Sequence, residues 1–183
     1  RVEDITYCRH VHYLIEEEGA WSKMRTTRVI CEIELEELDK VLKDKTAIVI
    51  NALDFKDYDK DKVPGSVNLP VSQLEKLGID AKEKRVIDFL KENTSKFKPI
   101  EEKVKSNKLD IKDVPIVVYC ANKKCKASRK LIDHLYECNV NNVLEWSGGM
   151  EKWNKERTFF GEDSSSDKES EKSSSDSDSD SDS

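Results

Sequence analysis

The stretch PIVVYCANKKCKAS, residues 115–128, decides the fold of this chain. An apolar run from Ile116 to Tyr119 leads into Cys120, a short polar loop follows, and residues 127–138 have apolar side chains at helical spacing. This order predicts a buried strand, a loop and a helix. Ligands of open parallel sheets bind at the carboxyl ends of the strands. We therefore expect Cys120 to lie at a ligand-binding edge.

The rest of the chain continues this alternation of strands and helices. Short apolar runs at 47–50, 67–69 and 143–144 predict further strands, and residues 33–42 have helical spacing. A last helix is expected after the glycine pair at 148–149, and a helical insertion at about 78–113, which is rich in Lys and Glu. We predict an α/β fold, an open parallel β-sheet of four to five strands flanked by helices on both faces.

Composition divides the chain into three parts. We predict an N-terminal extension at residues 1–30, a folded domain at 31–160, and a disordered Ser- and Asp-rich tail at 161–183. From Glu162 onward there are nine acidic residues and two lysines, a charge of −7, so the rest of the −6 chain carries +1. A nearly neutral domain predicts no nucleic-acid binding. A protein partner or a kinase would act on the acidic tail.

The cysteine content and the hydropathy of the sequence indicate the cellular compartment that we expect for the protein. No apolar run approaches the roughly 20 residues that span a bilayer, so we expect no membrane association. The five cysteines are an odd number, which favours free thiols in a reducing cytoplasm over a disulfide framework. Cys8, His10 and His12 alternate along the chain, but their spacing is not a known zinc pattern and no fourth ligand is evident. No metal or other cofactor is expected.

The residues after the predicted strand have the pattern of an activated nucleophile with an anion-binding loop. Backbone N–H groups of the loop and of the helix N-terminus should converge on the Cys120 sulfur and lower the pKa of its thiol. Cys120 is the candidate catalytic residue. The candidate substrate-binding loop consists of Ala121, Asn122, Lys123, Lys124, Cys125 and Lys126. The alternative is a cysteine that serves only as a small buried apolar side chain.

From residue 33 to residue 153 the chain resembles the rhodanese-like domain family. The first matching stretch is AIVINALDFKDYDKDKVPGSVNLP, which is similar to the family's LIDVR…EY…GHIPGAINIP. The loop stretch IVVYCANKKCKAS and the later NVLEWSGGMEKW follow in the family's order. The resemblance implies a sulfurtransferase of the thiosulfate type. Cys120 would take a sulfane sulfur from an anionic donor, hold it as a persulfide, and pass it to a thiol or to a cyanide-like acceptor.

Several positions depart from the family's pattern. Asn51 and Leu53 replace an Asp and an Arg, Lys62 replaces a His, and Cys125 replaces the usual Arg of the loop. These changes leave three alternatives open. One is a weak or inactive rhodanese-like module for binding or regulation. The others are a relative of the C-x5-R phosphatases, for which Lys126 is a poor substitute, and a thiol redox protein that uses Cys120 and Cys125.

Overall fold

The computed structural model describes residues 30–159. Apart from Ile30 itself, the predictions for the N-terminal extension, including the Cys8, His10 and His12 pattern, lie outside the described residues, as does the tail. Within the described range, no helix is long and apolar enough to cross a membrane.

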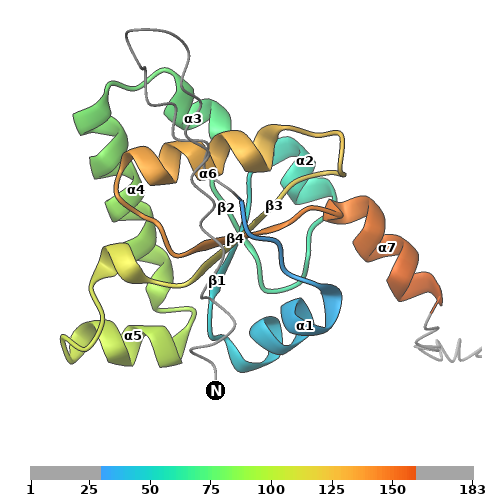
Figure 1. The fold of residues 1–183 in the computed structure, drawn as a ribbon, viewed down its shortest axis with the longest axis horizontal. Helices are drawn as coiled ribbons and strands as arrows, with labels where there is room; N and C mark the ends of the chain where they lie inside the picture. The colour runs from blue at the N-terminus through green and yellow to red at the C-terminus, as the bar shows by residue number, and fades with distance from the viewer. Residues whose placement is uncertain (1–29, 160–183) are drawn as a thin grey trace, which may run out of the picture.

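A four-stranded, fully parallel sheet forms the centre of the domain (Figure 1). Its order is β2-β1-β3-β4, and Ile50 of β1 pairs with Val67 of β2 and with Val118 of β3. The strands are β1 (Ile48–Asn51), β2 (Val67–Asn68), β3 (Ile116–Tyr119) and β4 (Val143–Trp146). All residues of β1, β3 and β4 are buried, as strands covered by helices on both faces require. The predicted open parallel sheet is confirmed.

Helices cover both faces of the sheet, and each face has its own apolar core (Figure 1). On one face Ile48 and Ile50 pack in a core with residues of α3 (Val71–Glu75), α4 (Ile79–Thr94), α5 (Lys98–Lys105) and α6 (Ala127–Glu137). On the other face Val49 and Val117 pack with α1 (Leu35–Asp44) and α7 (Gly149–Phe159). Trp153 of α7 is 7% exposed in this second core.

The stretch from residue 78 to residue 113 is helical, as predicted. It contains α4, α5 and a short 3-10 helix, η2 (Ile111–Asp113), and their apolar side chains join the core on the α6 face. Helix α2 (Phe55–Lys60) was not predicted, because it buries none of its side chains and its sequence FKDYDK has no apolar stripe.

The turn between α2 and β2 is hydrogen-bonded to β3, the strand that leads into the candidate nucleophile. The hydroxyl of Tyr119, the last residue of β3, accepts the N–H of Val63 at 3.0 Å and lies 2.7 Å from the hydroxyl of Ser66. Gly65 has a φ of +83° in this turn, a conformation that favours glycine. The Val-Pro-Gly turn therefore supports the end of β3 from the face that α1 covers.

Candidate active site

Cys120 lies immediately after β3, at the carboxyl edge of the sheet, as predicted. It is 2% exposed. Its thiol donates to the hydroxyl of Ser128 at 3.3 Å and lies 3.5 Å from the carbonyl oxygen of Cys125 and 3.8 Å from that of Asn122. The backbone N–H of Ser128, in the first turn of α6, also bonds to the sulfur. The loop and the start of α6 thus enclose the sulfur.

The side chain of Asn122 gives the loop its shape. Its Oδ1 accepts the N–H groups of Lys124 and Cys125, both at 3.0 Å, and its carbonyl oxygen also accepts the N–H of Cys125 at 3.1 Å. Such Asx turns reverse the chain within a few residues. The turn at Asn122 brings Cys125 back against Cys120, although four residues separate them.

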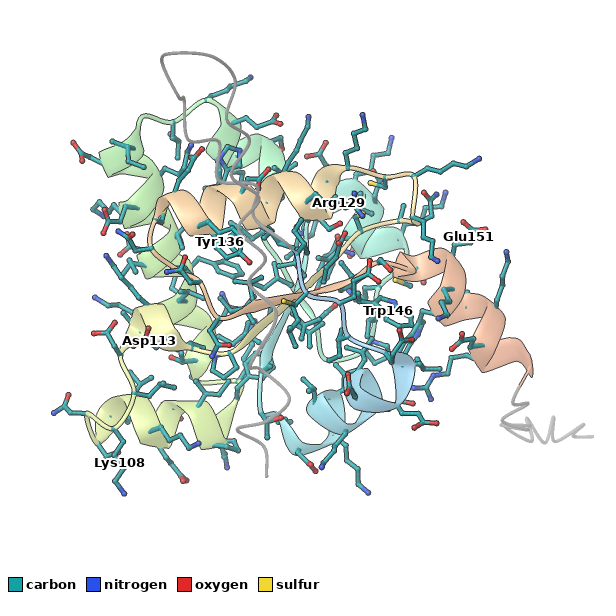
Figure 2. The ribbon with its side chains drawn as sticks, in the orientation of Figure 1. Lys108, Asp113, Arg129, Tyr136, Trp146 and Glu151 are labelled. Carbon is teal, nitrogen blue, oxygen red and sulfur yellow. The ribbon has the colours of Figure 1, made fainter. Side chains whose placement is uncertain are left out.

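Helix α7 supports the loop from the other side. The N–H of Met150 donates to the carbonyl of Cys120 at 3.0 Å, and the N–H of Glu151 donates to the carbonyl of Ala121 at 2.9 Å. Gly149, with φ at +58°, makes this approach feasible, since a Cβ there would lie 2.3 Å from the carbonyl oxygen of Cys120. Figure 2 shows Glu151 on the first turn of α7. The start of α7 therefore fixes the backbone on which the candidate nucleophile stands.

A buried carboxylate lies behind the nucleophile, and the sequence did not predict it as part of the site. Ser128 accepts from Cys120 and donates its own proton to Oε1 of Glu145 at 2.8 Å. Glu145 belongs to β4 and is 3% exposed, and its Oε2 lies 3.6 Å from Nε of Arg129. Arg129 stands on the end of α6 that leaves the loop (Figure 2). Sulfur, hydroxyl and carboxylate thus form one line of contacts, from Cys120 through Ser128 to Glu145.

The two thiols of the loop differ in their proton affinity, and the expectation of a lowered pKa at Cys120 is wrong. Burial raises the pKa of the Cys120 thiol above its ordinary value, although bonds from Ser128 oppose this. Partial burial acts on Cys125 in the same direction, but the N–H of Ala127, the Cys120 thiol and the N–H of Ala121 outweigh it and lower the pKa of Cys125. Burial thus favours the thiol form of Cys120, and the amide groups favour the thiolate form of Cys125.

The remaining predicted loop residues surround the two sulfurs. Lys123, Lys124 and Lys126 are exposed, and Lys126 is the N-cap residue of α6. Within residues 30–159 none of the three forms an ion pair, so they give the mouth of the loop an unpaired positive charge. Ala121 and Asn122 are half-buried and act through their backbone and the Asx turn.

Two of the positions that depart from the family's pattern, Asn51 and Leu53, lie at the end of the neighbouring strand β1. Asn51 pairs with Tyr119, and the N–H of Ala52 donates to the Tyr119 carbonyl at 3.0 Å, one residue before Cys120. The side chain of Asn51 accepts the N–H of Leu53 at 2.8 Å. The end of β1 therefore contributes an amide and an apolar side chain here, without the family's Asp and Arg.

The cysteines outside the loop do not all follow the expectation of free thiols. Cys138 is free and buried, but Cys31 is disulfide-bonded. The odd cysteine count therefore did not exclude a disulfide. Among residues 30–159, no three His, Cys, Asp or Glu side chains gather as a metal site.

The family model of the rhodanese-like domain matches residues 34–156. The chain belongs to the rhodanese-like domain family. Its Cys120 occupies the loop after β3 in the quoted motif, and the match spans nearly the whole described rhodanese-like domain. The resemblance expected from the sequence motifs is thereby confirmed.

Solved structures of the same fold are similar to this rhodanese-like domain at low identity. A human single-domain sulfurtransferase is 14% identical with a TM-score of 0.47, and the match covers 70% of this chain and 99% of that one. A single-domain sulfurtransferase of Saccharomyces cerevisiae is 13% identical with a TM-score of 0.47, covering 72% and 94%. A protein of Bacillus halodurans is 20% identical with a TM-score of 0.47, covering 69% and 72%. No curated protein matches the chain.

Proposed function

We propose that this rhodanese-like domain is a sulfurtransferase that carries a sulfane sulfur as a persulfide on Cys120. The sulfur of Cys120 attacks the sulfane sulfur of an anionic donor such as thiosulfate, the donor's S–S bond breaks, and sulfite leaves. A thiol or a cyanide-like acceptor then takes the sulfur. The observation that supports this proposal is the placement of Cys120 at the end of β3, with its sulfur bonded to the N–H of Ser128 at the start of α6.

The raised pKa of Cys120 means that its proton must leave during the attack. The line of contacts from Cys120 through Ser128 to Glu145 offers a buried route. Ser128 would pass its hydroxyl proton to Glu145 while taking the proton of Cys120, and the net result is a thiolate beside a neutral carboxyl group. Cys125, whose thiol has a lowered pKa, offers a second proton acceptor once it has lost its own proton.

Sulfur loading tests the proposal directly. Reduced protein, freed of reductant and incubated with thiosulfate, should release sulfite in proportion to the protein present. The sulfane sulfur of the thiosulfate should become bound to Cys120 before any other residue. A chain that releases no sulfite and gains no sulfur from thiosulfate or from an organic persulfide would instead support the binding module, the main alternative to an enzyme.

The exposed lysines of the loop are expected to act on donor capture. Replacing both Lys123 and Lys124 with Ala should raise the thiosulfate KM by roughly three- to tenfold, the scale of about one kcal/mol of surface electrostatics, with little change in kcat. The reason is that exposed charges attract the free anion more than they change the reacting geometry. Added salt should shrink the difference between the variant and the parent.

The matched control removes two other exposed lysines, Lys103 and Lys108, which lie on and after α5. Lys108 stands on the side of the domain away from the β3–α6 loop (Figure 2). The same loss of charge there should leave KM unchanged. An equal rise in KM for both double variants would show that net charge, rather than the loop, sets donor capture.

The hydroxyl of Ser128 should set the pH dependence of sulfur loading. Because the bond from Ser128 opposes the raised pKa of Cys120, Ser128→Ala should raise that pKa further and move the rise of the rate to higher pH. We expect about a tenfold lower rate at neutral pH, as for a lost hydrogen bond to a charged group. The measurement is the pH profile of sulfite release. If Ser128 had only a structural role, Ser128→Ala would lower the rate equally at every pH.

Two variants complete the Ser128 experiment. Ser128→Thr keeps a hydroxyl and should restore much of the parent profile. Ser106→Ala removes an exposed hydroxyl after α5 and should leave the profile unchanged. If Ser128→Ala keeps the parent profile, the route through Glu145 has no part in the reaction.

The proposal places the protein in the cytoplasm, where reducing conditions keep Cys120 and Cys125 as thiols. The disulfide at Cys31 is the feature that argues against this location. Counting the free thiols of protein isolated under rapid acid quenching distinguishes a reducing from an oxidising compartment.

We further propose that the acidic tail is contacted by a protein partner or a kinase.

A further inference from the structure

The sulfur of Cys125 occupies the part of the loop in which amide groups converge. It accepts hydrogen bonds from the backbone N–H of Ala121 and from that of Ala127, the first residue of α6. From the sequence we expected the amides of the loop to converge on the Cys120 sulfur. Cys125 instead turns inward, and its side chain is half-buried.

The two cysteines lie close together within this loop. The Cys120 sulfur lies 3.5 Å from the carbonyl oxygen of Cys125, and each thiol shifts the pKa of the other. The hydrogen bonds that Asn122 accepts fix this arrangement, because they hold the N–H of Cys125 in the turn. The turn thus places Cys125 against the sulfur of the candidate nucleophile.

The hydrogen bonds of the loop favour the thiolate form of Cys125. Burial acts to raise its pKa, but the two amides and the Cys120 thiol outweigh that effect and lower it. Thiolates, not thiols, attack disulfide and persulfide sulfurs. Of the free cysteines among the described residues, Cys138 is fully buried in the core beneath α6 and is unsuited to this reaction.

We propose that Cys125 is the resolving thiol of the Cys120 persulfide, so that the protein releases the sulfane sulfur as sulfide and retains a disulfide between Cys120 and Cys125. This inference rests on the proposed function, because it requires the persulfide. It assigns the protein a further activity, the reduction of sulfane sulfur to sulfide. This activity implies a co-substrate that reduces the Cys120–Cys125 disulfide back to two thiols. The co-substrate is a thiol or a dithiol, either a small molecule or a protein.

The step balances without an outside oxidant. The proton of Cys125 passes to the outer sulfur of the Cys120 persulfide anion, and the Cys125 thiolate attacks the inner sulfur of the persulfide. A bond forms between the two cysteine sulfurs, the bond to the outer sulfur breaks, and the outer sulfur leaves as hydrosulfide with that proton. It is reduced by two electrons, and the two cysteine sulfurs are oxidised to the disulfide. Two external thiols then reduce this disulfide and are themselves joined.

The experiment compares the parent chain with Cys125→Ser after reduction, removal of reductant and addition of thiosulfate. The parent should release one sulfide per chain, and its mass should fall by two hydrogens, with a peptide that contains Cys120 and Cys125 linked. Cys125→Ser should instead gain one sulfur atom, keep it, and release sulfide only when a thiol is added. Cys138→Ser is the matched control and should behave as the parent does.

The outcomes separate this inference from the proposed function. A parent chain that gains and keeps one sulfur, with no sulfide released, overturns the resolving role of Cys125 and leaves the sulfurtransferase proposal standing. No gain of sulfur and no sulfide from the parent or from Cys125→Ser overturns both. Thermal unfolding of the variants checks their fold, and Cys125→Ala provides a second substitution with the same expected persulfide.

Discussion

Cys120→Ser is expected to abolish sulfur uptake from thiosulfate. An alkoxide forms far less readily than a thiolate, and a hydroxyl oxygen cannot carry a sulfane sulfur as a persulfide. The substitution changes one atom of a buried side chain, so the fold should persist, with a free energy of unfolding within about 1 kcal/mol of the parent. Release of sulfite after thiosulfate treatment measures the uptake.

This result would also decide between the two loop thiols. Cys125 is the thiol with the lowered pKa, so an uptake of sulfur by Cys120→Ser at the parent rate would make Cys125 the nucleophile. The matched variant is Cys138→Ser, which removes a free thiol from the core and should load as the parent does. Peptide mapping of Cys125→Ser, the variant expected to keep its persulfide, locates the sulfur independently of any substitution at Cys120.

Gly149→Ala is expected to be the most damaging conservative change outside the thiols. A Cβ at this position would lie 2.3 Å from the carbonyl oxygen of Cys120 and 2.7 Å from the carbonyl carbon of Ala121, and the φ of +58° disfavours any L side chain. Backbone atoms cannot move aside as a flexible side chain can. We expect a loss of more than about 3 kcal/mol in the free energy of unfolding, or roughly 10 °C in Tm, together with loss of sulfur loading.

Gly78 provides the control. A Cβ at this position, at the start of α4, meets nothing within 4 Å, so Gly78→Ala should be nearly neutral. Gly148 is unsuited as a control, because a Cβ there would lie 2.6 Å from the Cβ of Lys152, an atom that is fixed to the backbone. Thermal unfolding compares Gly149→Ala with Gly78→Ala. Equal losses of stability in these two variants would contradict the close approach of α7 to the loop.

The strands of the sheet could be predicted from the sequence because continuous apolar runs indicate strands that are buried on both faces. Every residue of β1 and β3 is buried, and both strands were predicted to within one residue from their apolar runs. The place of Cys120 followed from β3 alone. Helix α2 escaped prediction because it has no buried side chain to create a periodic pattern.

The roles of Glu145 and Cys125 in the site could not be predicted from the sequence. Both roles depend on residues that are neighbours in space but not in the chain. Glu145 reaches Ser128 because β4 lies beside β3, with Val118 opposite Glu145, and strand order is not readable from one sequence. A carboxylate within the buried strand VLEW was the available signal. The inward turn of Cys125 depends on the hydrogen bonds of Asn122, and these appear only when the loop has its shape.

The amide groups that hold the Cys120 and Ala121 carbonyls come from Met150 and Glu151, in the last helix of the described chain. A ribosome makes these residues about thirty positions after the nucleophile, and domains generally fold as units during synthesis. The loop after β3 therefore gains this support only when α7 has docked. The observed shape of the loop depends on completion of the whole domain.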